Sequence, residues 1–371
     1  MVGLDIIRIV SMIFVIMVHV LGVGSAIASA EDTVLKSVLC FLQGVSLCCI
    51  NLFAMSSGFL HYGRKLHISG LMRLCLEGLI WILATTAAYA AFKQDMTIFT
   101  DNLKDYLLVI TKRQYWYLTD YVVLFFLIPF LNAAVEKVDL KPLTFALICI
   151  LFVTSVITTV FPYVDFVSRG YSAMWLAIMY LVGAYIKKYD VVHRANALAA
   201  VMFFLIFALL EGIYSFLSYT MGYDLKDYYY KFTSYNCIFV VGASVALFIA
   251  LAKINFKSNE IKKLFALLSS ASFTVYLVHA SPMIYDNCIV GRMSFIGNYD
   301  LLKALGALAA VVFAIYFGGT VLGLVQNLIF KILHIPNLLK FLENTINMCY
   351  DFLYRRCFGK LEINNSDIQG E

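Results

Sequence analysis

The chain has 371 residues, of which 62% are hydrophobic and only 14% are charged. Ordinary soluble domains carry about a quarter charged residues, so this composition excludes a typical water-soluble protein and indicates a membrane protein. The formal net charge of +5 is explained by Lys and Arg in membrane loops, so no nucleic-acid partner is expected.

Long apolar runs recur along the chain, and each reaches or approaches the roughly 20 residues that a helix needs to cross hydrocarbon. The alternating segments of a membrane barrel are absent. The sequence therefore predicts an all-α, polytopic membrane bundle of about ten transmembrane helices, because helices satisfy their own backbone hydrogen bonds in lipid. The expected spans are 5–27, 36–60, 71–92, 115–134, 142–162, 171–187, 195–221, 233–253, 264–290 and 303–330.

Two regions outside these spans have helical patterns of their own. Residues 95–114 are too polar to cross a membrane, but Leu103, Tyr106, Leu107 and Ile110 form an apolar stripe suited to its interface. Residues 1–334 are expected to form one membrane domain. Residues 335–371 are expected to form a cytoplasmic amphipathic helix with a disordered end from Asn364; its apolar positions are Leu338, Leu339, Leu342, Ile346 and Cys349.

Loop charges favour an orientation with both termini in the cytoplasm. Lys and Arg are more frequent in the loops that this orientation places inside, as the positive-inside rule requires. The nine cysteines lack the paired spacing of a zinc site or of a disulfide framework, so no metal is expected. The segment 26–30 resembles a signal-peptidase site, but the leader has no basic start, so cleavage is the less favoured alternative.

Arg8 and His19 are ionisable residues inside the first expected span. Charged groups are costly in a membrane and by default mark function. Their separation of eleven residues is about three helical turns, which places both side chains on one face about 16 Å apart along the axis. Such a pair is suited to an acyl transfer in which Arg8 binds an anionic donor and His19 activates a hydroxyl group. A snorkelling Arg and a structural His remain the alternative.

Four motifs follow one another along the chain. They are Leu4-Asp5-Ile6-Ile7-Arg8 with His19; the segment Asn51 to Leu60, containing Ser57-Gly58-Phe59, followed by Arg64-Lys65; Trp116-Tyr117-Leu118 with residues 129–132; and Ser272 to His279, containing Tyr276. This series resembles acyltransferase family 3, the integral membrane O-acyltransferases that include bacterial polysaccharide O-acetyltransferases. The resemblance covers residues 4 to about 330, and the order of the motifs is more specific than any one of them.

The resemblance implies transfer of an acyl group, expected to be acetyl, from cytoplasmic acyl-CoA to a hydroxyl of a cell-surface or lipid-linked carbohydrate. Arg8 and His19 become the catalytic pair, in which a neutral His19 takes the hydroxyl proton. The resemblance also implies membrane lipid as a partner, no tightly bound cofactor and a bacterial cell membrane. The expected substrate-binding residues are Ser57, Gly58, Phe59, Arg64, Lys65, Arg73, Trp116, Tyr117, Tyr276 and His279.

Several alternatives stay open at this point. Arg64, Lys65 and Arg73 are explained as well by topology as by CoA phosphates, and Gly58 as well by helix packing as by a ligand. Glu77 follows Arg73 by four residues and can pair with it. Glu211 is either a site residue or, preferably, the partner of a distant cation. The third span lacks the proline of many relatives. The leading alternative function is a transporter or flippase for a polysaccharide precursor; a polysaccharide polymerase, or an acyltransferase for lipids or amino acids, is also considered.

Overall fold

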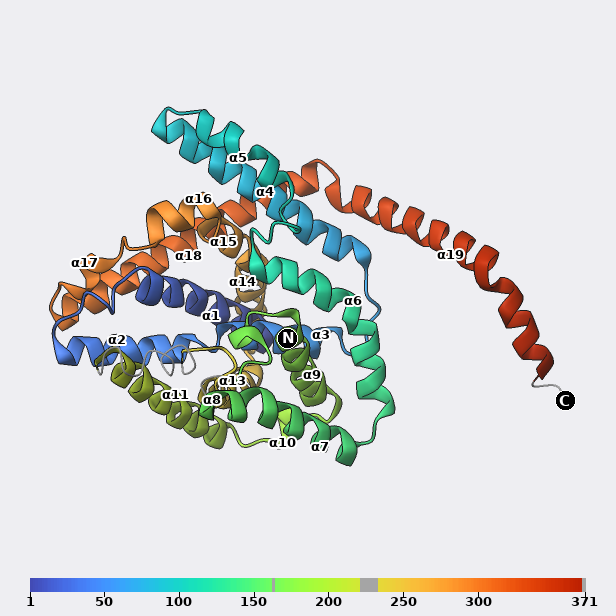
Figure 1. Ribbon diagram of the computed structural model, residues 1–371, viewed down its shortest axis with the longest axis horizontal. Coiled ribbons are helices and arrows are strands. Elements are labelled where there is room, and N and C mark those ends of the chain that lie inside the picture. Colours follow the sequence, from blue (N-terminus) through green and yellow to red (C-terminus); the bar gives the residue numbers. More distant parts are fainter. Residues whose placement is uncertain (162–163, 221–232, 369–371) are drawn as a thin grey trace.

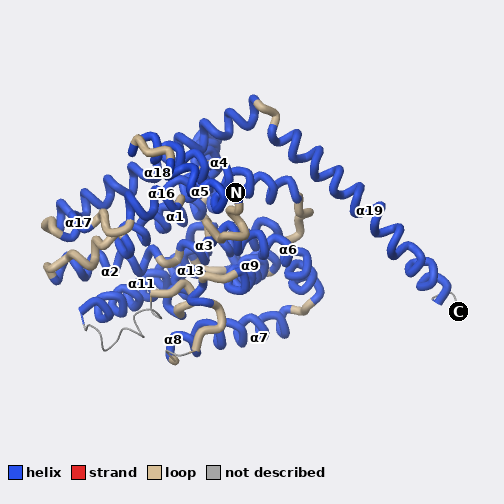
Figure 2. Tube along the Cα trace, turned by 45° about the horizontal axis from the view of Figure 1, so that its top comes forward, coloured by secondary structure: helices blue, strands red, loops and turns tan. Residues whose placement is uncertain are grey.

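The computed structural model describes residues 1–161, 164–220 and 233–368, and every regular element in these ranges is helical (Figures 1 and 2). The first half contains α1 (Val2–Val18), η1 (His19–Val23), α2 (Thr33–Ser46), α3 (Cys49–His61), α4 (Ile68–Lys93), α5 (Thr97–Leu107), α6 (Trp116–Lys137), α7 (Leu140–Leu151), η2 (Phe152–Ile157), α8 (Thr158–Val160), η3 (Ser168–Gly170) and α9 (Ala173–Lys188). The second half contains α10 (Val191–Arg194), α11 (Ala197–Thr220), α13 (Ile238–Ala252), α14 (Asn259–Ser270), α15 (Ser272–His279), α16 (Pro282–Ile284), η5 (Tyr285–Ile289), α17 (Ser294–Gly297), α18 (Leu301–Ile332) and α19 (Ile335–Ile368).

Eight helical stretches in the described residues are long and apolar enough to cross a membrane. They correspond to eight of the ten expected spans, so the predicted membrane helical bundle is confirmed. The other two expected spans coincide with α9, of 16 residues, and α13, of 15 residues. Both of these shorter helices are largely buried among their neighbours. The count of ten stays a prediction.

Glycine allows the closest helix contact in the bundle, between α3 and α9. A Cβ placed on Gly58 would lie 2.0 Å from the carbonyl oxygen of Tyr180, and a Cβ on Gly183 would lie 2.0 Å from that of Met55. Each backbone can approach the other this closely only because the residue at the contact is a glycine without a Cβ. The position of Gly58 is therefore explained by helix packing.

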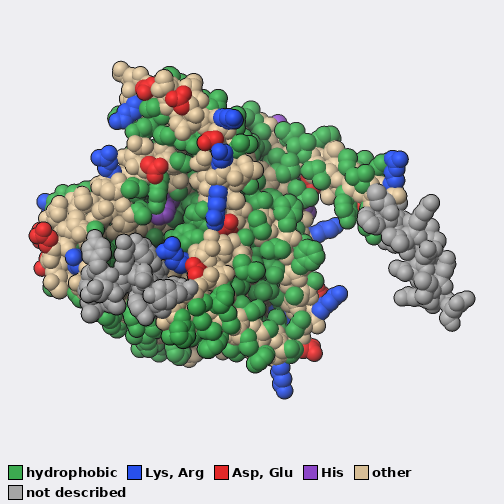
Figure 3. Space-filling view, viewed as in Figure 1, with side chains coloured by type: hydrophobic (Ala, Val, Ile, Leu, Met, Phe, Trp, Pro, Cys, Tyr) green, Lys and Arg blue, Asp and Glu red, His purple; other side chains and the backbone are tan. Residues whose placement is uncertain are grey.

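The outer surface of the bundle is apolar, as a lipid-facing surface requires. Figure 3 shows hydrophobic side chains over much of the visible body, with Lys and Arg scattered singly between them. Large exposed apolar residues include Phe145 and Ile148 on α7, Leu198 and Phe203 on α11, and Phe313 on α18. This distribution inverts that of a water-soluble bundle and agrees with immersion in a membrane.

Four expected spans are not continuous α-helices, and one of them, the fifth, changes to the π-helix η2 after α7. The first changes to a π-helix at His19. The second is divided by a turn at Leu47 and Cys48 into α2 and α3. The ninth, expected at 264–290, is divided at Ala271 into α14 and α15, and α15 ends at His279. Apolar periodicity does not reveal these breaks, because the flanking residues are apolar in either backbone conformation.

Two helices lie beside the bundle core. The apolar stripe of residues 95–114 falls partly on α5, which packs along α4 (Figure 1). The helix α19 begins at Ile335, directly after α18, and extends away from the bundle (Figures 1 and 2). It is attached through Glu343, whose carboxylate accepts hydrogen bonds from the Ile68 backbone N–H (2.9 Å) and the Ser69 hydroxyl (2.7 Å) at the start of α4.

Candidate active site

One face of α1 forms a wall of a cavity inside the bundle. Arg8, Met12 and Val15 line a cavity of about 300 Å³. These positions follow the i, i+4, i+7 spacing of one helix face, and His19 is the next position on the same face. The sequence prediction that Arg8 and His19 share a face is therefore consistent with the helix α1, and the cavity lies along the stretch that separates them.

Three expected substrate-binding residues also line this cavity. Ser57 comes from α3, Tyr117 from α6 and Tyr276 from α15. The remaining lining is apolar or consists of Ser and Tyr side chains, so Arg8 supplies the positive charge in this wall among the described residues. A mostly apolar cavity with a few convergent polar groups is typical of a small-molecule site.

His19 lies where α1 changes from α-helix to π-helix. Single π-helical turns are rare and are often found at functional sites, because the extra residue re-aims the side chains around it. The imidazole of His19 contacts the ring of His279, with centroids 5.2 Å apart, and the ring of Tyr285, with centroids 5.0 Å apart. Its Nδ1 atom is buried and has no hydrogen-bond partner among the described residues.

His279 is held in one orientation by its own helix. Its Nδ1 lies 2.5 Å from the carbonyl oxygen of Val275. A carbonyl oxygen only accepts hydrogen bonds, so this geometry assigns the proton to Nδ1 and leaves Nε2 as an acceptor. That Nε2 atom is also buried without a described partner. Two adjacent imidazoles thus each carry a buried nitrogen that is available to a water or to a substrate.

Loop contacts bring the two histidines together from opposite ends of the chain. The backbone N–H of Gly291 donates to the carbonyl oxygen of Val23 (2.9 Å), and that of Met293 donates to Gly24 (2.9 Å). These hydrogen bonds join the segment after η5 to the end of η1. On the other side, the buried phenol of Tyr115 donates to the Leu277 carbonyl oxygen (2.8 Å) and holds α15 against α6.

Tyr276 connects the cavity with the histidine pair. It lines the cavity, and its ring centroid lies 6.3 Å from that of His279 and 6.2 Å from that of Tyr117. The end of the cavity is therefore one aromatic ring away from the two imidazoles. A narrow ligand that extends along α1 from Arg8 would direct its tip toward them.

A second cavity adjoins the Arg8 end of the first. It has a volume of about 320 Å³, and Arg8 and Arg64 both line it. Asp5 lies beside Arg8, at 3.9 Å, and accepts a hydrogen bond from the Ser269 hydroxyl (2.8 Å). Lys65 is exposed and is not part of this lining. The structure thus separates two neighbouring basic residues that the sequence grouped together.

Arg73 has internal partners instead of facing the first cavity. Its Nε lies 2.7 Å from Glu77, as the spacing of four residues predicted, and its guanidinium donates to Asn327 (2.5 Å). It lines a neighbouring cavity of about 410 Å³, which shares Leu74 and Phe273 with the first.

The other expected site residues lie outside the cavity. Gly58 faces Tyr180 on α9, and Phe59 packs against Phe248 and Lys187. Trp116 contacts Tyr117, Tyr171 and Tyr235 near the start of α6.

Sequence reasoning missed Tyr285, and for Glu211 it preferred a distant cation as the partner. No motif signals Tyr285, because only the fold of η5 brings it to His19. Glu211 is fully buried, and its described partner is the Cys237 thiol at 3.5 Å; no Lys or Arg pairs with it among the described residues.

Most of the chain matches a known protein family. The model of the family-3 acyltransferase domain matches residues 1–325, which is most of the chain. The chain belongs to acyltransferase family 3. Searches of curated proteins and of solved structures returned no match. Membership supports an acyltransferase activity in a membrane protein, so the resemblance drawn from the four motifs is confirmed.

Proposed function

We propose that this acyltransferase transfers an acetyl group from acetyl-CoA to a carbohydrate hydroxyl, with His19 as the general base. The observation that carries the proposal is the face of α1 on which Arg8, Met12 and Val15 line one cavity and His19 follows. A charge that can hold a phosphorylated donor and a base that can deprotonate a hydroxyl thus lie on one rigid element.

The donor enters at the Arg8 end. A cavity of about 300 Å³ suits the narrow acyl-pantetheine arm rather than the nucleotide of CoA. The nucleotide and its phosphates remain in the adjoining basic cavity, where Arg8 and Arg64 can bind them through charged hydrogen bonds. The proposed cytoplasmic position of this end agrees with the cellular location of acyl-CoA.

The chemistry takes place beside the two imidazoles. The acceptor oxygen attacks the thioester carbonyl carbon while its proton passes to His19. A C–O bond forms, the C–S bond breaks, and the proton passes from His19 to the departing CoA thiolate. The ring of His279 packs against the imidazole of His19 and holds its orientation. The products are the acetyl ester and CoA, and no metal or oxidant is required.

The test uses purified protein in lipid nanodiscs with acetyl-CoA labelled in the acetyl group. Carbohydrate acceptors are supplied as free glycosides and as lipid-linked glycans extracted from the source membrane. We expect release of CoA thiol to match the appearance of acetyl esters in the NMR spectrum of the glycan. Absence of both acetyl-CoA binding and ester formation would contradict the proposal, and movement of an unmodified glycan across the bilayer would favour the transporter.

A further inference from the structure

An aromatic cluster lies at the start of α6 and α9, next to the histidine pair. The ring of Tyr171 lies 4.7 Å from Trp116 and 4.9 Å from Tyr235, and Trp116 stacks on Tyr235 at 6.3 Å with an angle of 18°. Tyr235 is 4% exposed and forms the base of the cluster, whereas Tyr171 is 41% exposed. One aromatic ring is thus presented outward on a packed aromatic support.

The backbone before Tyr171 has positive φ angles, which residues with a side chain rarely adopt. Ser168, Arg169 and Gly170 have φ values of +51°, +55° and +90° in succession. A Cβ on Gly170 would lie 2.6 Å from the Cβ of Tyr235, so only glycine fits there. Unfavourable backbone angles persist where the surrounding contacts over-determine them, and such segments cluster at binding sites.

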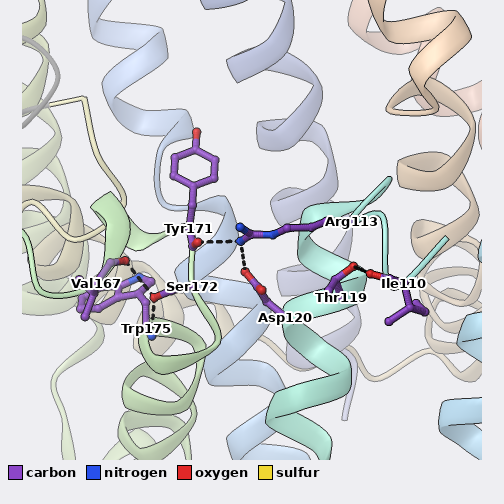
Figure 4. A network of polar contacts seen from close by, with 8 residues as sticks. All are labelled: Ile110, Arg113, Thr119, Asp120, Val167, Tyr171, Ser172 and Trp175. Carbon is purple, nitrogen blue, oxygen red and sulfur yellow. Dashed lines mark hydrogen bonds and ion pairs between the residues drawn. The ribbon is translucent and has the colours of Figure 1, made fainter. Parts of the chain in front are cut away.

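Polar contacts fix this loop to its neighbours (Figure 4). Arg113 donates to the carbonyl oxygen of Tyr171 (2.9 Å) and pairs with the buried Asp120 (2.7 Å), so the loop before α6 holds the loop before α9. Figure 4 shows the ring of Tyr171 directed away from this ion pair. The backbone of Tyr235 is fixed to α3, because its carbonyl oxygen accepts a hydrogen bond from the side-chain amide of Asn51 (2.8 Å). The cluster is therefore preorganised.

Ring contacts connect the cluster with the histidine pair, and the ring of Tyr285 lies 5.0 Å from that of His19. The ring centroids of Trp116 and Tyr117 lie 5.7 Å apart, those of Tyr117 and Tyr276 lie 6.2 Å apart, and those of Tyr276 and His279 lie 6.3 Å apart. Because Tyr171 packs on Trp116, a continuous series of ring contacts joins Tyr171 to the histidine pair.

We propose that the exposed ring of Tyr171, supported by Trp116 and Tyr235, is the surface on which a sugar ring of the acceptor stacks. This inference rests on the proposed function and names the acceptor side of the same site. A pyranose ring has an apolar C–H face that packs on an aromatic ring, while its hydroxyls stay free to reach Tyr285 and His19. A lipid-facing belt does not account for the cluster, because its rings contact one another and Tyr235 is buried.

The experiment measures the acceptor KM of the full chain in nanodiscs, with saturating acetyl-CoA and a panel of methyl glycosides as probes. Tyr171→Ala is expected to raise the acceptor KM about 10-fold or more, while Tyr171→Phe keeps the ring and stays near wild type. Phe166→Ala is the matched control, since Phe166 is an exposed aromatic on the same loop. Acetyl-CoA affinity should be unchanged in all three variants.

The outcomes separate this inference from the proposed function. Suppose that the wild type acetylates a glycoside. If Tyr171→Ala then has the same acceptor KM as the wild type, or if Tyr171→Phe raises the acceptor KM as much as Tyr171→Ala does, the proposed stacking surface is wrong. The proposed acetyltransferase activity is unaffected by either result. If wild type acetylates neither the probes nor the native glycan, the proposed function and the stacking surface fail together. A folding defect in Tyr171→Ala would appear as lost acetyl-CoA binding. In that case the acceptor KM of Trp116→Phe, which keeps an aromatic ring, is compared with that of Trp116→Leu, which removes it.

Discussion

The imidazoles of His19 and His279 lie 5.2 Å apart, although 260 residues separate them in the chain. His19 begins η1 and His279 ends α15, and each has a buried nitrogen without a described partner. In the proposed mechanism His279 is a positioning residue for His19, which leads to a prediction.

Replacement of His279 by Ala should lower transfer by roughly 10- to 100-fold, less than loss of the base itself. The reason is that His19 keeps its position at the start of η1 but loses the ring that packs against it. His279→Asn should recover part of the rate, since a short amide can occupy the same space and hydrogen-bond. The measurement is kcat against pH for both variants. A purely structural His279 would change protein yield and leave the pH profile of the surviving enzyme unaltered. His193→Ala, on an exposed histidine, is the control.

Arg64 and Lys65 are adjacent in sequence but differ in the structure. Arg64 lines the basic cavity with Arg8, and Lys65 does not. Arg64→Ala should weaken acetyl-CoA binding by about 10-fold, as expected for loss of one charged hydrogen bond, whereas Lys65→Ala should change it less than 3-fold. Calorimetry in nanodiscs measures both. Equal effects of the two variants would show that these residues act through membrane topology or general attraction.

Much of the fold follows from the sequence, because apolar run length determines which segments enter a membrane. Helical periodicity also places Arg8 and His19 on one face and pairs Arg73 with Glu77. The π-helical turn at His19, the division between α14 and α15, and the approach of Tyr285 depend on contacts between distant segments. No local pattern encodes them. The role of Gly58 also cannot be predicted from the sequence. Only the structure shows that the Tyr180 carbonyl oxygen occupies the space where a side chain at residue 58 would begin.

Substitution of Gly58 tests the packing explanation. Gly58→Ala should cost at least about 1–3 kcal/mol of stability, because its Cβ would lie 2.0 Å from a backbone oxygen that cannot rotate away. Gly306→Ala, where the same Cβ meets open space, should be neutral or slightly stabilising. Thermal unfolding in nanodiscs compares the two. A Gly58→Ala protein that melts like wild type but loses acetyl-CoA binding would instead place Gly58 against a ligand.

The attachment of α19 to α4 should depend on pH. The Ser69 hydroxyl and then the Ile68 N–H and His67 lower the pKa of Glu343 below its ordinary value. A carboxylate with a depressed folded-state pKa stabilises the contact above its unfolded pKa of about 4.3, and the stabilisation is lost as pH falls through the folded value. Hydrogen exchange at the start of α4 should therefore increase on acidification. Glu343→Gln should show the increase already at pH 7; protection equal to wild type in that variant would contradict the account.

The most direct test of the central claim is the comparison of binding and transfer in His19→Gln. If His19 is the general base, the variant should insert, bind acetyl-CoA within about 3-fold of wild type, and lose acetyl transfer to the carbohydrate by roughly 10² to 10⁴. Acetyl-CoA affinity by calorimetry and acetyl esters by NMR are measured on the same nanodisc preparation. Wild-type levels of carbohydrate O-acetylation in His19→Gln would contradict the mechanism.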